Sequence, residues 1–283
     1  MEVGKKFKNI NSYNENMSKH IKDKLFWLDK FSDKHYTIVD FGCADGTIIN
    51  NLCETNKDNH YMHTYIGYDI SETMIDIAKT NFHGDDNEDV IFTSSWDEVK
   101  EKLNENKNRI KILFLSSVIH EVYSYAKSTE EIDDFWNKVF DSDFDYVIVR
   151  DMMVTYDTYR YVNSSELNKV YGKVKYEKQV ADFEEKHGEL KIMKNFMHFL
   201  LKYRWKINWK REVNEDYFPI MVEDFLELME HDYNIDYLER FRVSFLDDEI
   251  KKDFDVKLTD YTHIKIIFSK KKENFGVRDT FGL

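Results

Sequence analysis

The stretch TIVDFGCADGTIINNL, residues 37–52, begins as an apolar run and ends in an acid, a glycine-bearing turn and an amphipathic segment. The chain has only nine glycines in 283 residues, and two of them, Gly42 and Gly46, lie here. A β-branched apolar run, then glycines, then helical spacing is typical of a buried strand, a tight turn and a helix. We therefore expect a strand over 37–42 and a helix over 47–55.

Further strand and helix patterns alternate after this stretch. The segments 64–70, 89–95, 111–117 and 146–152 are short, mostly apolar and rich in β-branched and aromatic residues, which suits buried parallel strands. Helical spacing occupies 72–82, 96–104 and 129–140 between them. This alternation predicts an α/β fold with a doubly wound sheet.

The pattern changes after Met153. From about Tyr156 to Tyr217 the chain is charged and aromatic, with helical spacing in 176–185 and 190–205, so we expect a helical cap inserted after the fifth strand. An amphipathic helix over 218–231 follows, with the only proline, Pro219, near its first turn. Strands over 237–245 and 263–270 then flank a short helix over 247–254. The last strand alternates polar and apolar residues, as an edge or antiparallel strand would.

These boundaries divide the chain into parts. Residues 1–155 and 217–272 form the sheet domain, of which 1–32 is an N-terminal helical cover; residues 156–216 form the cap, which we expect to bind substrate; and residues 273–283 form a tail. The sheet is expected to have seven strands, mostly parallel, with an antiparallel last strand.

Composition narrows the function classes. No apolar run approaches a membrane span and the N-terminus lacks a signal-peptide core, so we expect no membrane partner and a cytoplasmic location. The only cysteines, Cys43 and Cys53, show neither the pattern of a disulfide framework nor the clustered ligands of a zinc site. We expect small buried thiols and no metal.

Charge is distributed unevenly along the chain. The net charge is -13, yet between Asn168 and Arg211 twelve Lys/Arg face five acids, a local net charge of +7. Within this segment, cations interleave with aromatic residues over 196–211, including Arg204 and Trp205. Such a mixture suits a substrate that carries phosphate groups and a nucleobase. Alternatively, the segment is a solvated helix surface, on which blocks of charge are common. Both interpretations stay open, and Arg204 and Trp205 are candidate substrate-binding residues.

The turn after the first strand is expected to face a ligand. Ligands of open α/β sheets bind beyond the carboxyl ends of the strands, where a glycine lets the backbone come close. The spacing here is Asp-x-Gly-x-Ala-x-Gly, from Asp40 to Gly46, rather than the dinucleotide pattern G-x-G-x-x-G. A carboxylate at Asp40 would oppose a pyrophosphate and would suit a ligand that carries an ammonium group.

The motif VDFGCADGT resembles the first motif of class I S-adenosylmethionine-dependent methyltransferases. The resemblance implies a Rossmann-like fold and S-adenosyl-L-methionine as cofactor. It places the cofactor on the turn, at Asp40, Gly42, Cys43, Ala44 and Gly46. In this family an acid at the end of the second strand accepts hydrogen bonds from the ribose hydroxyls, a role that fits Asp69. Ile70 and Met74 would lie against the adenine or ribose, although Met74 also suits a core position.

Three more segments carry the resemblance. After the third strand, Ser95 and Trp96 would contact the adenine, unless Ser95 only caps the next helix. The ending LFLSSVIHEVYSY of the fourth strand is similar to many of these enzymes. It implies contacts to the methionine moiety from Ser116 and Ser117 and a substrate rim at His120, Glu121 and Tyr123. Family members often cover the cofactor with an N-terminal helix, which implies contacts from Tyr13 and Met17.

Methyl transfer requires alignment of a nucleophile and, in some cases, removal of its proton. His120 is the candidate base, with Glu121 to orient or replace it; alternatively, His120 packs beneath the cofactor. Arg150 and Asp151 end the fifth strand, and we expect a substrate role for Arg150 and a catalytic one for Asp151, unless they form a local ion pair. The chain lacks the Asn/Asp-Pro-Pro-Tyr and Pro-Cys motifs of DNA methyltransferases.

Three functions remain open at this stage. The first is methyl transfer to an O or N atom of an anionic substrate such as RNA or a nucleotide. The second is methyl transfer to a small metabolite held under the cap. The third is a catalytically silent cofactor-binding or interaction protein, against which the set Asp40, Gly42, Gly46 and Asp69 argues.

Overall fold

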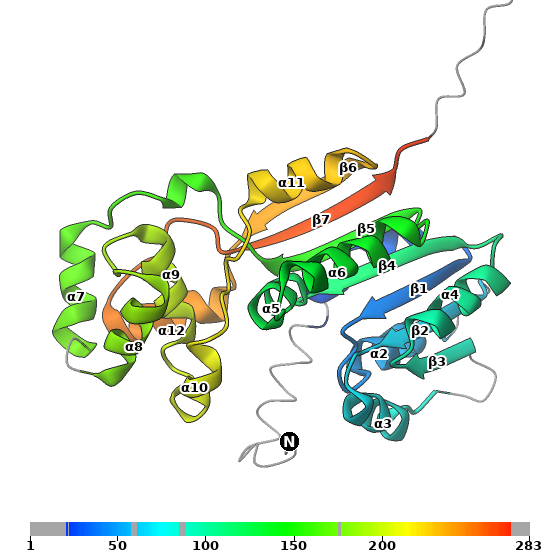
Figure 1. Ribbon diagram of the computed structural model, residues 1–283, viewed down its shortest axis with the longest axis horizontal. Helices are drawn as coiled ribbons and strands as arrows, with labels where there is room; N and C mark the ends of the chain where they lie inside the picture. Colours follow the sequence, from blue (N-terminus) through cyan, green and yellow to red (C-terminus); the bar gives the residue numbers. More distant parts are fainter. Residues whose placement is uncertain (1–20, 22, 58–60, 85–88, 175–176, 273–283) are drawn as a thin grey trace, which may run out of the picture.

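The computed structural model describes residues 21, 23–57, 61–84, 89–174 and 177–272. Its centre is a seven-stranded sheet with the order β3-β2-β1-β4-β5-β7-β6 (Figure 1). The strands are β1 Tyr36–Phe41, β2 His63–Tyr68, β3 Asp89–Thr93, β4 Ile110–Ser116, β5 Tyr146–Met152, β6 Tyr233–Phe241 and β7 His263–Lys270. The predicted fold class is confirmed, because the alternating strands and helices build one doubly wound α/β sheet.

The strand directions follow from the connections. β1 pairs in parallel with β2 and β4, β2 with β3, and β4 with β5. β7 runs antiparallel to both β5 and β6, which confirms the antiparallel last strand. The edge position considered for it is wrong, since β6 covers its outer side and all of its residues up to Phe268 are buried. The carboxyl ends of β1, β2, β4 and β5 therefore meet at one edge of the sheet.

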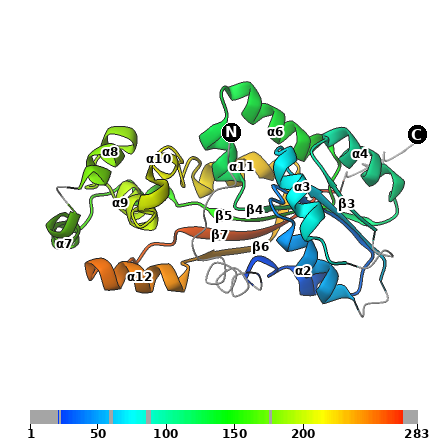
Figure 2. The ribbon, with the colours of Figure 1, turned by 90° about the horizontal axis from the view of Figure 1, so that it is seen from below.

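Helices cover both faces of the sheet, as Figure 2 shows in the view along its edge. One face carries α2 (Thr47–Asn56) and α3 (Glu72–Asn81), and the other carries α4 (Trp96–Glu105), α6 (Thr129–Asp141) and α11 (Val222–Glu230). All five were predicted. None of the helices in the described ranges is long and apolar enough to cross a bilayer.

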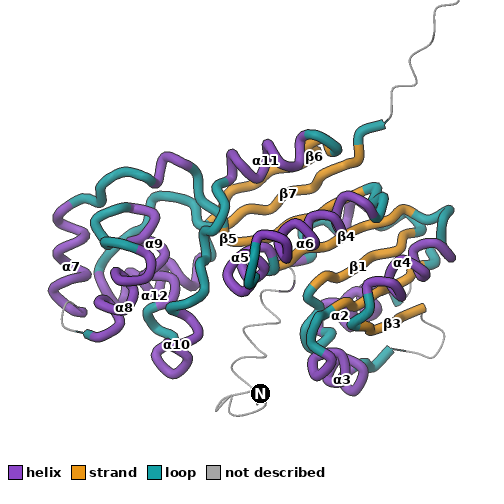
Figure 3. Tube along the Cα trace, in the orientation of Figure 1, coloured by secondary structure: helices purple, strands orange, loops and turns teal. Residues whose placement is uncertain are grey.

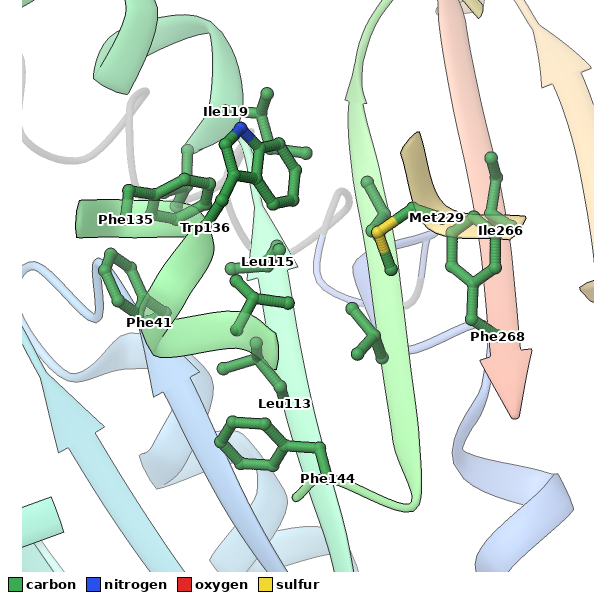
Figure 4. Close-up of a cluster of buried hydrophobic side chains, with 14 of the residues drawn as sticks. Phe41, Leu113, Leu115, Ile119, Phe135, Trp136, Phe144, Met229, Ile266 and Phe268 are labelled. Carbon is green, nitrogen blue, oxygen red and sulfur yellow. The ribbon is translucent and has the colours of Figure 1, made fainter. Parts of the chain in front are cut away.

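The larger core fixes the strand ends that form the site. Phe41 of β1 lies edge-on to Phe135 of α6, with ring centroids 5.2 Å apart (Figure 4). The neighbouring Trp136 packs on Phe225 of α11, with ring centroids 6.0 Å apart. Fully burying side chains of this size contributes about 1.5–3 kcal/mol each. Leu115, near the carboxyl end of β4, is buried in the same cluster.

Two boundaries near the end of the chain were wrong. The helix expected over 218–231 begins only at Val222, because Met221 forms a β-bridge with Val154 and is itself extended. Pro219 therefore precedes the helix instead of lying in its first turn. The strand expected over 237–245 is β6, Tyr233–Phe241, and the segment after it enters α12 (Ser244–Phe254).

A second cluster of helices lies beyond the carboxyl edge (Figure 3). It contains α7 (Ser164–Val174), α8 (Lys178–His187), α9 (Met193–Lys202), α10 (Trp209–Glu212) and α12. α7 had not been predicted, and α12 packs into the apolar core of the cap although the sequence division assigned it to the sheet domain. The domain boundaries as a whole stay a prediction, and most of the proposed N-terminal cover lies outside the described residues.

Candidate functional site

The turn after β1 contains two glycines, so it presents backbone without side chains at the edge of the sheet. The N–H groups of Gly42 and Cys43 both donate to the carbonyl of Tyr68, at 2.7 and 3.0 Å, which ties the turn to the end of β2. Gly42 has φ +75°, and a Cβ there would lie 2.8 Å from Cγ2 of Val118. Gly46 has φ +78°, and its Cβ would lie 3.0 Å from the Phe92 ring. Both positions therefore require glycine, for close packing as well as for the left-handed backbone.

Two buried polar atoms at this edge have no partner within the described structure. Oδ2 of Asp40, at the end of β1, and Oγ of Ser116, at the end of β4, are both buried without a hydrogen bond. Burial raises the pKa of Asp40 to about 7, and the neighbouring Asp69 and Asp45 also raise it, against the lowering effect of Lys24. A buried polar atom without a partner costs free energy, so these atoms are suited to receive a ligand.

Asp69, at the end of β2, is fixed by two backbone donors. Its Oδ2 accepts from the N–H of Ala44 at 3.1 Å and its Oδ1 from the N–H of Ser71 at 2.9 Å. Each carboxylate oxygen keeps a second lone pair, which leaves the group able to accept from two adjacent hydroxyls. The next residue, Ile70, is 81% exposed above the edge, and Met74 is half-buried.

The end of β3 has a largely structural arrangement. Oγ of Ser95 accepts from the N–H of Glu98 at 3.4 Å, so Ser95 caps α4, as one of the two alternatives held. Trp96 is half-buried and packs its ring against Phe41 and Tyr68, with centroids 5.6 and 5.0 Å away. The adenine contact from these two residues stays a prediction.

A short helix absent from the sequence expectations, α5 (Ile119–Tyr125), follows β4. Ser117 has φ +60°, a left-handed turn that redirects the chain into this helix. Oδ2 of Asp151 accepts from the N–H groups of Val118 at 2.9 Å and Ile119 at 2.7 Å. Asp151 is fully buried, and it holds the start of α5 onto the end of β5.

His120 lies between two carboxylates. Its Nδ1 is 2.5 Å from Asp151 and its Nε2 is 3.1 Å from Oε1 of Glu215. Burial lowers the pKa of His120, but the charges and hydrogen bonds of both acids outweigh burial and raise this pKa to about 10. The ring is then an imidazolium that donates from both nitrogens, which does not suit the general base expected from the sequence. This geometry favours the alternative, a buried packing role.

The outer face of α5 meets the cap. The guanidinium of Arg211 lies 3.0 Å from Glu121 and 3.7 Å from Glu215, and its Nε donates to Oη of Tyr125 at 3.2 Å. Tyr125 in turn donates to Oε2 of Glu215 at 3.1 Å. His120, Glu121 and Glu215 are close enough together to hold a metal ion, but Arg211 already supplies positive charge to both acids. Glu121 therefore pairs with Arg211 instead of orienting His120.

The sequence of the chain matches a known family. Residues 32–203, more than half of the chain, match the model of a methyltransferase domain. The chain belongs to this methyltransferase family. It is an S-adenosylmethionine-dependent enzyme, and S-adenosyl-L-methionine is its cofactor. The third function considered from the sequence, a catalytically silent protein, is therefore set aside.

Solved structures similar to the methyltransferase are distant in sequence. The plantazolicin methyltransferase BamL, in complex with a triazolic desmethyl analogue and S-adenosylhomocysteine, shares 14% identity over 92% of this chain and 89% of its own, with a TM-score of 0.46. Magnesium protoporphyrin IX methyltransferase from Synechocystis PCC 6803, with bound S-adenosylhomocysteine, shares 12% identity over 96% and 90%, with a TM-score of 0.47. No curated protein sequence matches the chain.

Three of the predicted substrate residues have partners within the protein, and their substrate contacts stay a prediction. The Tyr123 hydroxyl accepts from Nε1 of Trp136 at 3.1 Å, on the α6 side of α5. Arg150 is buried and forms an ion pair with Asp23 at 2.8 Å. Arg204 pairs with Glu249 and, at 3.0 Å, with Asp253. Trp205 is half exposed, and Tyr13 and Met17 lie outside the described residues.

Most described cations of the cap's basic segment have acidic partners, some within the segment itself and some elsewhere in the chain. Among its described cations, Lys169 pairs with Asp255 at 2.8 Å and Lys173 donates to the carbonyl of Asp253, both in or just after α12. The other partnered cations pair within the cap or with α5: Lys178, Lys191, Lys194, Lys206 and Arg211. Lys202 is wholly buried. Acids from other segments, among them Glu249, Asp253 and Asp255, therefore offset part of the local excess of positive charge.

Proposed function

We propose that the enzyme transfers a methyl group to an O or N atom of a compact small molecule, held beside the cofactor where α5 meets α10. The observation that carries this proposal is the pairing of Lys169 and Arg204, two cations of the basic segment, with acids in and just after α12. A nucleic-acid substrate needs unpaired cations to replace the counterions of its phosphates. Here Arg204 is paired with Glu249 and Asp253, and the indole of Trp209 donates to Asp182 at 3.1 Å.

The residues of the edge fit the cofactor. Within the described residues, Oδ2 of Asp40 and Oγ of Ser116 are buried without a hydrogen-bond partner, which suits polar groups of the methionine moiety. A Cβ at position 42 would clash with Val118, so only glycine leaves space beside the turn. We assign the ribose hydroxyls to Asp69, whose two oxygens are oriented by backbone donors. The bound cofactor supplies an electrophilic methyl group.

The side chains of the enzyme then contribute by aligning the acceptor with this methyl group. Methyl transfer needs no covalent intermediate on the protein, so alignment of the acceptor is the main contribution. Tyr125, whose side chain is 44% exposed, offers a phenol at the end of α5 to hold the acceptor. Glu121, whose side chain is half exposed, lies next to it and pairs with Arg211; burial raises the pKa of Glu121 above its ordinary value.

Labelled methyl transfer tests this proposal. The purified enzyme is incubated with methyl-labelled S-adenosylmethionine and, separately, total RNA, DNA and a metabolite extract, at about 50 and about 200 mM salt. We expect label in the small-molecule fraction, with little salt dependence. Label in nucleic acid that falls steeply with salt would contradict the compact acceptor and restore the anionic one.

A matched pair of variants sharpens the test. Arg211→Gln removes the cation beside Glu121 and Tyr125, whereas Lys210→Gln removes the neighbouring cation, which forms no ion pair within the described residues. We expect Arg211→Gln to raise the KM for the acceptor and Lys210→Gln to leave it unchanged. Equal losses from both variants would indicate general attraction of a polyanion.

A further inference from the structure

A continuous chain of contacts runs from the interior of the cap to the cofactor turn. It begins at Lys202, wholly buried at the end of α9, whose ammonium donates to the carbonyl of Glu212 at 2.6 Å and to that of Glu215. The same ammonium lies 4.2 Å from the centre of the Tyr217 ring. Lys202 therefore fixes the segment after α10, including the backbone of Glu215, onto α9.

The side chain of Glu215 continues the chain across to the sheet. Its two oxygens serve different partners on α5: Oε1 meets His120 and Oε2 accepts from Tyr125, each at 3.1 Å. Glu215 is itself buried. Glu215 thus connects the cap to α5 through two hydrogen bonds. Breaking a buried hydrogen bond to a charged group costs free energy, so this connection holds the two elements together.

The last links reach the cofactor turn. His120 is held by Asp151, and Asp151 binds the N–H groups of Val118 and Ile119. Val118 is the residue whose Cγ2 would lie 2.8 Å from a Cβ on Gly42. A shift of Val118 would therefore move the wall against which the glycine turn packs, because close-packed groups transmit small displacements.

We propose that Glu215 is a positioning residue, which acts through His120, Asp151 and Val118 so that docking of the cap and binding of the cofactor stabilise each other. This inference rests on the part of the proposed function that places the cofactor at the turn after β1. Coupling between two sites is reciprocal: if the cap favours cofactor binding, the cofactor must tighten the cap to the same extent. Glu215 touches neither the turn nor Asp69 among the described contacts.

The test uses S-adenosylhomocysteine and no methyl acceptor, so its outcome does not depend on which acceptor the enzyme uses. In the wild type, hydrogen exchange is measured with and without S-adenosylhomocysteine. We expect added protection in the cap segment 212–217 as well as around 116–119. Protection confined to 116–119 and the cofactor turn would overturn the coupling, and this arm needs no variant.

Two variants separate positioning from simple stabilisation. Glu215→Gln keeps the size of the side chain but removes the charge that faces His120, whereas the control Glu212→Gln alters the same segment at a carboxylate that accepts from the Tyr217 hydroxyl at 2.6 Å. We expect Glu215→Gln to weaken S-adenosylhomocysteine binding about fivefold or more, the lower end of typical coupling, and to abolish the cap protection. Lower thermal stability with unchanged affinity, or equal affinity losses in both variants, would show a merely structural role.

Discussion

Asp40→Asn is expected to stabilise the protein without cofactor and to weaken cofactor binding. The carboxyl of Asp40 is buried, one of its oxygens has no partner in the described structure, and burial raises its pKa from 3.8 to about 7. Each pKa unit corresponds to 1.36 kcal/mol, so ionised Asp40 costs the folded state about 4 kcal/mol. Asparagine has nearly the same shape and carries no charge.

The sign of the pH dependence follows from the raised pKa. Between the unfolded value near 3.8 and the folded value near 7, the folded protein retains a proton that the unfolded chain has lost. The contribution of Asp40 to stability therefore falls as pH rises through this window, and the full penalty is present above it. Asp40→Asn should raise the free energy of unfolding most at pH 8 and progressively less toward pH 5.

Cofactor binding should respond in the opposite direction. If Asp40 receives the ammonium group of the methionine moiety, wild-type affinity for S-adenosylhomocysteine should increase between about pH 6 and pH 8, as the carboxyl ionises. The Asp40→Asn variant should bind more weakly and lack this increase. Affinity for 5′-methylthioadenosine, which has no ammonium or carboxylate group, should be equal in both proteins.

The assay is denaturant unfolding at several pH values, combined with calorimetric titration of both ligands. A variant that is no more stable than the wild type at pH 8 would refute the burial argument. Equal pH dependence of S-adenosylhomocysteine binding in the two proteins would refute the ammonium assignment. Each result can be obtained without the other, so the two parts of the reasoning are tested separately.

Three further predictions concern other parts of the site. Asp69→Ala should weaken S-adenosylhomocysteine binding about tenfold or more in calorimetry, since hydrogen bonds to a charged group contribute about 1.5–3 kcal/mol each, while Asp76→Ala on the exposed side of α3 should not. Gly46→Ala should lower the free energy of unfolding by about 1–2 kcal/mol in denaturant titration, because φ is +78° and the Phe92 ring lies 3.0 Å from the new Cβ. Lys202→Met should cost about 2–3 kcal/mol in the same assay, since the carbonyls of Glu212 and Glu215 lose a buried donor; an unchanged value would contradict the role given to Lys202.

Much of the sheet could be predicted because its signals are local. Buried parallel strands appear in a sequence as short apolar runs. Of the seven strands of the sheet, six lie within two residues of the expected limits. The predicted range of β6 was displaced because this strand lies at the outer edge of the sheet. Its residues from Asn234 to Leu238 are exposed and carry no continuous apolar pattern. Its limits come from pairing with β7, which a local pattern does not contain.

The polar chain from the cap to α5 was missed because its members are far apart in sequence. Glu215 meets His120 across 95 positions and Tyr125 across 90. One local signal was available: His120 and Ser124, like Glu121 and Tyr125, are four residues apart and share a helix face. Treating this segment as a helix would have placed Tyr125, rather than Tyr123, beside Glu121.

The sequence of the basic segment left two interpretations open, a substrate-binding surface and a solvated helix surface, for a similar reason. Its partners in and after α12, among them Glu249, Asp253 and Asp255, come more than forty positions after the cations that they neutralise. Net charge over a window describes the segment and not the surface it forms, because a later helix can pack its acids against it. Pairing of this kind becomes visible only in the folded cap.

The structure of the enzyme in complex with S-adenosylhomocysteine tests the central claim most directly. The account predicts the ribose hydroxyls on Asp69, the amino group on Asp40, and the sulfur atom facing the junction of α5 and α10, where Tyr125 lies. A sulfur atom directed away from this junction, or a ligand bound at another edge of the sheet, would contradict it.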